Sequence, residues 1–291
     1  MADPWRRLHA ALKALAWSAL ALLFSGLAWA LHTPRAATED LPALVPHQAF
    51  EALVGLALSW AFLRLEGRPL ASLGLRLDGR WLRLFAVGAA LGGGIILAAA
   101  LGAALGAGVR WRPGTPSAAT LLAGAWLYLA VAWAEELHYR GYPFQRLCEG
   151  FGPGFAQVLF AVYFVYGHWQ NPGMQGATRA WAALNIGLAS LLLGYAWIRT
   201  GSLALSLGLH FGWNFVQGPL LGFGVSGTHG ASVLEPVLPE AWAWMHGGAF
   251  GLEAGLPCAV AAALALLLVA RLPRADAILE GSEEGPCRDG S

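Results

Sequence analysis

Long stretches without a charged side chain recur along the whole chain. An apolar helix needs about 20 residues to cross a bilayer, because each residue adds about 1.5 Å toward a hydrocarbon core of roughly 30 Å. Six runs lack Asp, Glu, Lys and Arg, and two more contain a single glutamate, Glu51 or Glu253. The pattern predicts about eight transmembrane helices, at residues 10–31, 43–64, 84–108, 116–138, 154–170, 180–198, 202–222 and 250–270.

Turn-forming residues separate these runs, as in Asn171-Pro-Gly and Gly67-Arg-Pro. We expect one all-α, polytopic membrane domain over residues 1–274, followed by a short polar tail at residues 275–291. The first run ends in Ala28-Trp-Ala, which resembles a signal-peptide cleavage site. Cleavage there would leave seven spans with the same orientation.

The composition supports a membrane protein and excludes several other classes. Hydrophobic residues make up 57% of the chain and charged residues 12%, with a mean hydropathy of +0.55. A soluble domain carries about 25% charged residues, roughly twice as many. The net charge of +1 argues against a nucleic-acid partner. The three cysteines have no paired spacing that would indicate a disulfide framework or a cysteine metal site.

The basic residues predict the orientation, since Lys and Arg accumulate in cytoplasmic loops. With eight spans and a cytoplasmic N-terminus, fourteen of the eighteen basic residues fall in cytoplasmic segments. The other four are Arg35, Arg110, Arg112 and Arg179. We therefore expect both termini in the cytoplasm. The Ala-, Arg- and Gly-rich composition with a single Lys is typical of GC-rich bacteria, so we expect a bacterial inner membrane.

Polar side chains inside three predicted spans need an explanation, because a charge at membrane depth costs at least about 2.5 kcal/mol. Glu135 and Glu136 follow a long uncharged run, and Arg140 lies four residues after Glu136 on the same helical face. His168 lies near the end of the fifth span, and the seventh contains His210 and Asn214, also four apart. We expect the helices to enclose a polar cavity at these residues.

Each group also has a simpler interpretation. Arg140 could reach the headgroups from a helix end, and His168 could belong to an interfacial aromatic belt beside Trp169. The polar stripe that includes His210 could be a seam of interhelical hydrogen bonds; its members are Ser202, Ser206, His210, Asn214 and Gln217. Two adjacent carboxylates are harder to explain in this way, because the inner leaflet is itself anionic.

Together these residues supply the groups needed to activate water on a carbonyl. A glutamate or a histidine can act as general base, and an asparagine amide can stabilise an oxyanion. No serine or cysteine occurs in a recognisable nucleophile motif. Water is therefore the expected nucleophile, although spacing alone leaves open which glutamate is the base.

The motifs, in order, resemble those of the CPBP family, the CAAX-processing and bacteriocin-processing (Abi) intramembrane endopeptidases. The resemblance rests on Glu135-Glu136-x-x-x-Arg140, Phe164-x-x-x-His168 and His210-x-x-x-Asn214, and covers roughly residues 115–220. It implies an eight-helix glutamate-type protease in which Glu135 and His168 activate water. It further implies that His210 and Asn214 stabilise the oxyanion, and that Glu136, Arg140 and Phe164 support the site. His138 and Tyr139 depart from the family pattern, and His138 could perturb the base.

Two other interpretations stay open. Glu135, His168 and His210 could hold zinc, with Glu136 as the base, although no H-E-x-x-H motif is present. The chain could also be a non-catalytic immunity or scaffold protein. For the protease we expect no cofactor, a membrane protein or peptide as substrate, the lipid bilayer as surroundings, and no nucleic acid. The sequence does not identify the substrate.

Overall fold

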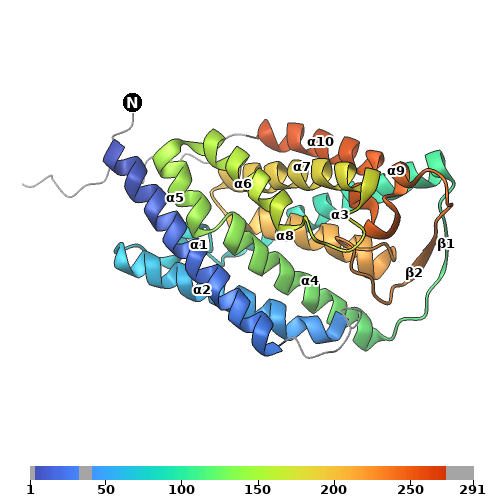
Figure 1. Cartoon of the computed structure of the whole chain (residues 1–291), viewed down its shortest axis with the longest axis horizontal. Helices are drawn as coiled ribbons and strands as arrows, with labels where there is room; N and C mark the ends of the chain where they lie inside the picture. Colours follow the sequence, from blue (N-terminus) through green and yellow to red (C-terminus); the bar gives the residue numbers. More distant parts are fainter. Residues whose placement is uncertain (1–3, 33–40, 273–291) are drawn as a thin grey trace, which may run out of the picture.

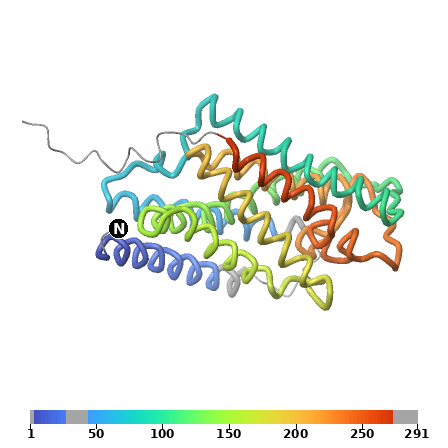
Figure 2. Tube along the Cα trace, turned by 90° about the horizontal axis from the view of Figure 1, so that it is seen from above, coloured from blue at the N-terminus to red at the C-terminus, as the bar shows by residue number. Residues whose placement is uncertain are grey.

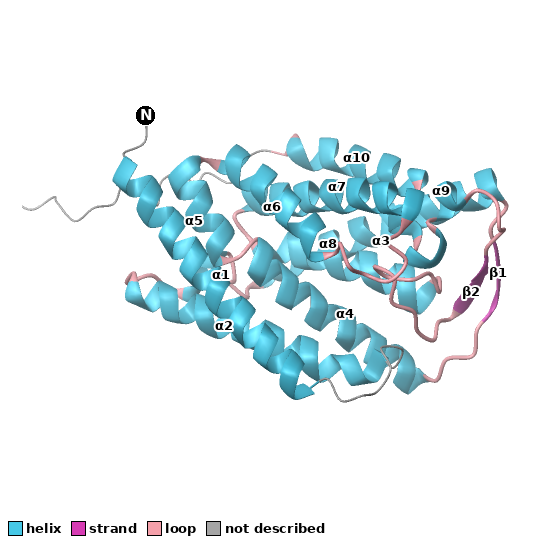
Figure 3. Cartoon of the chain, in the orientation of Figure 1, coloured by secondary structure: helices cyan, strands magenta, loops and turns pink. Residues whose placement is uncertain are grey.

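The computed structural model describes residues 4–32 and 41–272, where the chain is almost entirely helical (Figure 1, Figure 3). The predicted all-α fold of a polytopic membrane protein is confirmed. The predicted tail, residues 275–291, lies outside the described residues. The α-helices are α1 (Pro4–His32), α2 (Leu41–Leu65), α3 (Gly79–Ala107), α4 (Ala118–Tyr139), α5 (Tyr142–Phe151), α6 (Pro153–Gly167), α7 (Gly176–Thr200), α8 (Leu203–Phe215), α9 (Ala243–His246) and α10 (Leu256–Ala270).

The helices differ in whether they are long enough to span a membrane. Among the described residues, five stretches are long and apolar enough, lying in α1, α2, α3, α4 with α5, and α7. Helices α6, α8 and α10 have 15, 13 and 15 residues, which corresponds to about 20 Å each. They are shorter than the predicted spans at 154–170, 202–222 and 250–270. The total of eight spans stays a prediction.

Local chemistry explains why these three helices are short. Helix α6 ends at Gly167, and α8 gives way to a π-helical turn, Val216–Leu220, that contains Pro219. Before α10 the chain forms two 3-10 turns, Gly248–Phe250 and Leu252–Ala254. Proline and glycine disfavour a continuous α-helix at such points. The interruptions place loop segments beside the polar residues of these predicted spans.

Two features were not predicted from the sequence. Helix α5 follows α4 after a break at Arg140 and Gly141. Strands β1 (Arg110–Pro113) and β2 (Leu234–Val237) form an antiparallel pair at one end of the molecule (Figure 1). Their pairing connects the segment after α3 with the long segment between α8 and α10.

Glycines allow α3 and α8 to pack with their backbones in close contact. A Cβ added at Gly92 would lie 2.0 Å from the carbonyl oxygen of Leu209, and one at Gly212 would lie 2.1 Å from that of Ala89. Small residues permit such approach between membrane helices, where van der Waals packing replaces the hydrophobic effect. The view from above shows α10 beside α7 and α3 (Figure 2). Helix α8, which carries His210 and Asn214, is thus held against several neighbours.

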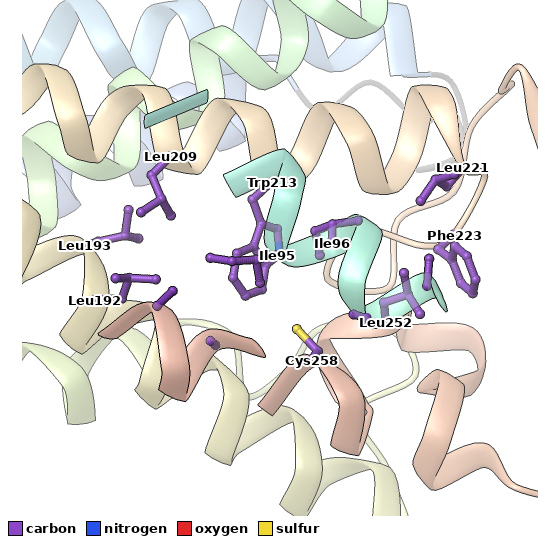
Figure 4. Close-up of a cluster of buried hydrophobic side chains, with 14 of the residues drawn as sticks. Ile95, Ile96, Leu192, Leu193, Leu209, Trp213, Leu221, Phe223, Leu252 and Cys258 are labelled. Carbon is purple, nitrogen blue, oxygen red and sulfur yellow. The ribbon is translucent and has the colours of Figure 1, made fainter. Parts of the chain in front are cut away.

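A cluster of buried apolar side chains fills the space between α3, α7, α8 and α10 (Figure 4). Ile95 and Ile96 come from α3, Leu209 and Trp213 from α8, and Cys258 from α10. Leu209 and Trp213 lie next to His210 and Asn214 in the sequence. The close packing of these side chains therefore restricts the rotation of α8 about its axis.

An ion-pair network joins α1, α2 and α5 at the end of the molecule opposite the strand pair. Glu66 lies 2.9 Å from Lys13 and 2.8 Å from Arg146, and it accepts a hydrogen bond from the hydroxyl of Tyr142. Burial raises the pKa of Glu66, but the hydrogen bonds and the nearby cations together lower it below its ordinary value. Arg68 pairs with Glu149 at 2.9 Å. These basic residues are among those predicted to be cytoplasmic.

Replacement of Gly92 by alanine tests the close contact of α3 and α8. We expect Gly92→Ala to lower the free energy of unfolding by about 1–3 kcal/mol, because the added methyl group cannot fit against the α8 backbone. Gly94→Ala is the matched control, since a Cβ there meets nothing within 4 Å. The thermal unfolding of both variants in detergent is the measurement. Equal stability of the two variants would contradict the packing argument.

Candidate active site

The last turn of α4 places two adjacent carboxylates in different surroundings. Consecutive residues on a helix point about 100° apart, so Glu135 and Glu136 face different neighbours. The side chain of Glu136 is fully buried, whereas that of Glu135 is 26% exposed. Oε2 of Glu135 accepts no hydrogen bond from the described residues. The two glutamates can therefore serve different purposes.

Glu136 binds two partners through a single oxygen. Its Oε1 lies 3.2 Å from Nη1 of Arg140 and 2.8 Å from Nδ1 of His210. The first contact is the pair predicted from the spacing of four on α4. The second joins α4 to α8 and was not predicted from the sequence. A buried carboxylate with two charge-assisted contacts is costly to disturb, because an unpaired charge would remain in an apolar interior.

Arg140 extends this contact to two further helices. Its Nη2 donates to the carbonyl oxygen and the hydroxyl oxygen of Ser190 on α7, at 3.1 and 3.0 Å. The guanidinium carbon lies 4.7 Å from the centre of the Phe164 ring on α6, a cation–π distance. Arg140 is 1% exposed and does not reach the lipid headgroups. The interpretation of Arg140 as a snorkelling helix-end residue is wrong for this reason.

The hydrogen-bond partners of the two imidazoles indicate where their protons lie. Nδ1 of His210 faces the carboxylate of Glu136, and Nδ1 of His168 lies 2.8 Å from the carbonyl oxygen of Phe164. Carbonyl and ionised carboxylate oxygens only accept, so each Nδ1 carries a hydrogen and donates it. In the neutral rings Nε2 is then the unprotonated nitrogen. Nε2 of His210 lies 3.7 Å from Oε2 of Glu135.

A cavity of about 320 Å³ brings the predicted catalytic residues together. Glu135 of α4, His168 at the end of α6, and His210 and Asn214 of α8 all line it, as does Phe164. Glu136 and Arg140 are not among its lining residues and lie behind it. The three motifs therefore meet at one site, with the ion pair supporting its wall. Apolar side chains complete the lining, among them Leu127, Val131, Ile186, Leu193 and Leu209.

The polar stripe on α8 serves two purposes. The hydroxyl of Ser206 donates to the carbonyl oxygen of Leu193 on α7 at 2.9 Å, as expected for a seam between helices. Gln217 donates to the carbonyl oxygen of Gly224 at 2.6 Å. His210 and Asn214 instead line the cavity. The interpretation as a packing seam thus holds for Ser206 and Gln217, whereas His210 and Asn214 belong to the cavity wall.

His138 lies away from the cavity that its neighbours line. Its Nε2 lies 2.8 Å from the hydroxyl of Tyr163, and its ring packs edge-on against Trp17 of α1. It is absent from the cavity lining, whereas Tyr139 is present. A direct contact between His138 and the candidate base is therefore not part of this arrangement.

Glu253 is a cavity residue to which the sequence assigned no role. It lies in the 3-10 turn before α10, is 7% exposed and lines the cavity with Trp213, Ser226 and Asn185. The sequence contains two signals: a single acid within the apolar run from Ala241 to Ala270, and a looser extension of the family resemblance over His246-Gly-Gly-Ala-Phe-Gly-Leu-Glu253. An apolar run does not indicate which helices the acid faces. The contacts of Glu253 are made between three loops that are separate in the sequence.

The described residues contain no group of three or more His, Cys, Asp or Glu side chains placed to hold a metal ion. Glu135, His168 and His210 share the cavity without forming such a group. The predicted zinc alternative therefore has no assembled ligand set in the described part of the chain, and we derive no step through a metal.

Comparison with known proteins adds independent support. Residues 116–216 match the family model of the type II CAAX prenyl endopeptidases described as Rce1-like. The matched segment is therefore similar to this family of endopeptidases. All three motifs lie within it, which confirms the resemblance to the CPBP family. No curated protein and no solved structure matches the chain.

The Rce1-like match has a direct functional consequence. It supports a CAAX-type intramembrane protease in general, hence a hydrolase. The long apolar helices agree with an integral membrane protein. The Rce1-like segment runs from α4 to the first residue after α8. It thus contains the helices that carry Glu135, His168 and His210, but not the turn with Glu253.

Loss of either partner of the buried ion pair should reduce the amount of folded protein. We expect Glu136→Ala and Arg140→Ala to cost about 3–5 kcal/mol each, because the remaining charge would be buried without compensation. Arg112→Ala is the control, since its pair with Glu235 is exposed and should contribute at most about 1 kcal/mol. The yield of monodisperse protein after detergent extraction is the measurement. Normal yields for both alanine variants would show that the pair is not needed for folding.

Proposed function

We propose that the protein is an intramembrane endopeptidase that hydrolyses a peptide bond of a membrane-associated protein or peptide with activated water. The observation that carries the proposal is the presence of Glu135, His168, His210 and Asn214 around one cavity. The Rce1-like match supports the same reaction class independently. Water is the nucleophile because, among the described residues, the cavity lining contains no cysteine and a single serine, Ser226, which has no adjacent base motif.

Glu135 and His168 each accept one of the two protons of the attacking water. Oε2 of Glu135 has no hydrogen-bond donor among the described residues, so it is free to accept the first proton as the water oxygen attacks the carbonyl carbon. Glu135 then passes this proton to the nitrogen that leaves. Nε2 of His168 accepts the second proton when the tetrahedral intermediate collapses to a carboxylate. The imidazole is suited to this step because Nδ1 is already committed to Phe164.

His210 and Asn214 stabilise the negative oxygen of the tetrahedral intermediate. Nδ1 of His210 contacts the carboxylate of Glu136, which can serve as counter-charge when the ring carries a proton on both nitrogens. Nε2 can then donate toward the cavity, beside the amide of Asn214 one helical turn away. Donors held rigidly in a site with little water are effective because they need no reorganisation during the reaction.

The surroundings of the cavity suit a substrate that arrives from the membrane. Its walls include leucine, isoleucine and valine side chains from α4, α7 and α8. We place the protein in the cell membrane of a bacterium, with both termini cytoplasmic. The orientation is supported by the basic ion-pair network at one end, which contains Lys13, Arg68 and Arg146.

Replacement of the cavity residues tests the proposed chemistry. We expect Glu135→Ala, His168→Ala and His210→Ala each to abolish cleavage, and Asn214→Ala to reduce kcat on the order of 100-fold through loss of one oxyanion donor. The measurement is turnover by purified protein, with thermal unfolding as a check on folding. His9→Ala is the control, because His9 is exposed and does not line the cavity. Unaltered turnover in the first or second variant would refute the mechanism.

A comparison of membrane proteomes both finds the substrate and tests the scaffold alternative. A strain with Glu135→Gln and a deletion strain should accumulate the same uncut polypeptide, because the change removes the base and retains the fold. Complementation of the deletion by Glu135→Gln would instead support a non-catalytic role.

Chelation separates the glutamate mechanism from a zinc-dependent one. We expect EDTA and phenanthroline to leave turnover unchanged, because Glu135 rather than a metal ion activates the water. The measurement is the rate before and after chelator, then after added zinc. Loss of activity that zinc restores would overturn the glutamate assignment.

A further inference from the structure

Glu253 is a third carboxylate at the cavity, and the proposed reaction leaves it unused. An acid in an apolar interior is costly unless it is paired or hydrogen-bonded. Glu253 is 7% exposed and sits in the turn Leu252–Ala254, outside the Rce1-like segment. Its burial at the cavity wall therefore needs a physical reason.

Both oxygens of Glu253 are held by N–H donors. Nε1 of Trp213 donates to Oε2 at 3.2 Å, and the backbone N–H of Ser226 donates to Oε1. An ionised carboxylate offers only acceptors, so two donors match the charged form. Ser226 adopts a left-handed conformation with φ of 49°, which is uncommon for a residue other than glycine. The loop thus accepts an unfavourable conformation where its N–H meets Glu253.

Three loops contact one another around the carboxylate of Glu253. The side chain of Asn185 donates to the carbonyl oxygen of Gly255 at 3.1 Å, which holds the Glu253 turn against α7. The N–H of Gly227 donates to the carbonyl oxygen of Phe250 at 3.0 Å. A Cβ at Gly227 would lie 1.9 Å from the carbonyl oxygen of Pro172, in the loop that follows His168. Glu253 is therefore fixed relative to the loop that begins at His168.

His168 and Glu253 line the same cavity. The other titratable groups around His168 are Glu135, Tyr139 and His210, which line the cavity, and Arg179, whose guanidinium stacks on Trp169. In the proposed reaction Glu135 carries the first proton from water to the leaving nitrogen. Glu253 takes no part in that transfer, so its carboxylate remains available to face a proton on His168.

We infer that Glu253 is a positioning residue that stabilises the imidazolium of His168 while this ring holds the second proton of water. The inference rests on the proposed function. The O–H bond of the tetrahedral intermediate breaks, the proton moves to Nε2 of His168, and the electron pair completes the product carboxylate. A nearby fixed carboxylate favours this transfer because it attracts the cation that forms, most strongly where little water is present. Glu253 acts on the reaction through His168 rather than as the acid or base.

Glu253→Gln is the principal test. We expect kcat to fall roughly 10-fold or more with KM unchanged, since general acid–base steps contribute about 10²–10⁴ in rate. A modest decrease in the thermal midpoint is expected, because the amide NH2 of glutamine replaces one of the two oxygens that accept from N–H donors and that hydrogen bond is lost. Glu235→Gln, an exposed acid outside the cavity, should leave kcat unchanged. An unchanged kcat for Glu253→Gln, measured per folded enzyme, would overturn the inference.

A double-mutant comparison shows whether the effect passes through His168. In the His168→Ala background, assayed with excess enzyme for the residual single-turnover cleavage that remains once multiple turnover is lost, Glu253→Gln should cause no further decrease. An equal decrease in both backgrounds would mean that Glu253 acts elsewhere and would refute the inference. Trp213→Phe removes one donor to Glu253 and keeps an aromatic ring. It should give a smaller decrease in kcat, also absent without His168, and it serves as the test if Glu253→Gln does not fold.

Failure of the inference can be told from failure of the proposed function. If the unmodified protein cleaves no substrate, the proposed function fails; if Glu135→Ala retains turnover, the proposed mechanism fails whatever Glu253 does. If Glu135→Ala is inactive and Glu253→Gln has full kcat, only the inference fails. Abolished turnover in Glu253→Gln together with activity in Glu135→Gln would identify Glu253 as the base and overturn both.

Discussion

The arrangement of the site depends on one buried carboxylate, that of Glu136. It holds Arg140 on its own helix and His210 on α8, and Arg140 in turn binds Ser190 on α7 and lies against Phe164 on α6. In an apolar interior these contacts are strong, and the loss of any partner would leave a charge without compensation. One ionic cluster thus connects four of the helices that contribute to the cavity.

The position next to Glu136 is free for chemistry because helical geometry turns the two carboxylates apart. Glu136 is enclosed, whereas Glu135 is partly exposed and reaches the cavity. The two histidines follow a similar division. Each uses Nδ1 for a fixed acceptor, Glu136 or the Phe164 carbonyl. Structural contacts therefore occupy one side of each functional group and leave the other side for substrate and water.

Short helices make this site possible within an apolar protein. Helices α6, α8 and α10 end or begin near the cavity, and the loops between them bring Ser226 and Glu253 to its wall. Irregular backbone at membrane depth is tolerated only where protein or a polar cavity satisfies its hydrogen bonds. The contacts of Asn185 with Gly255 and of Gly227 with Phe250 meet that requirement here.

The sequence by itself determined the all-α membrane fold, the three motifs and the pairing of Glu136 with Arg140, because hydropathy and a spacing of four residues depend only on local geometry. Only the tertiary structure decided that His210 shares Glu136, that α6, α8 and α10 are short, and that Glu253 joins the cavity. These features arise from contacts between segments far apart in the chain. Such contacts depend on how the helices and loops pack, and no local pattern records them.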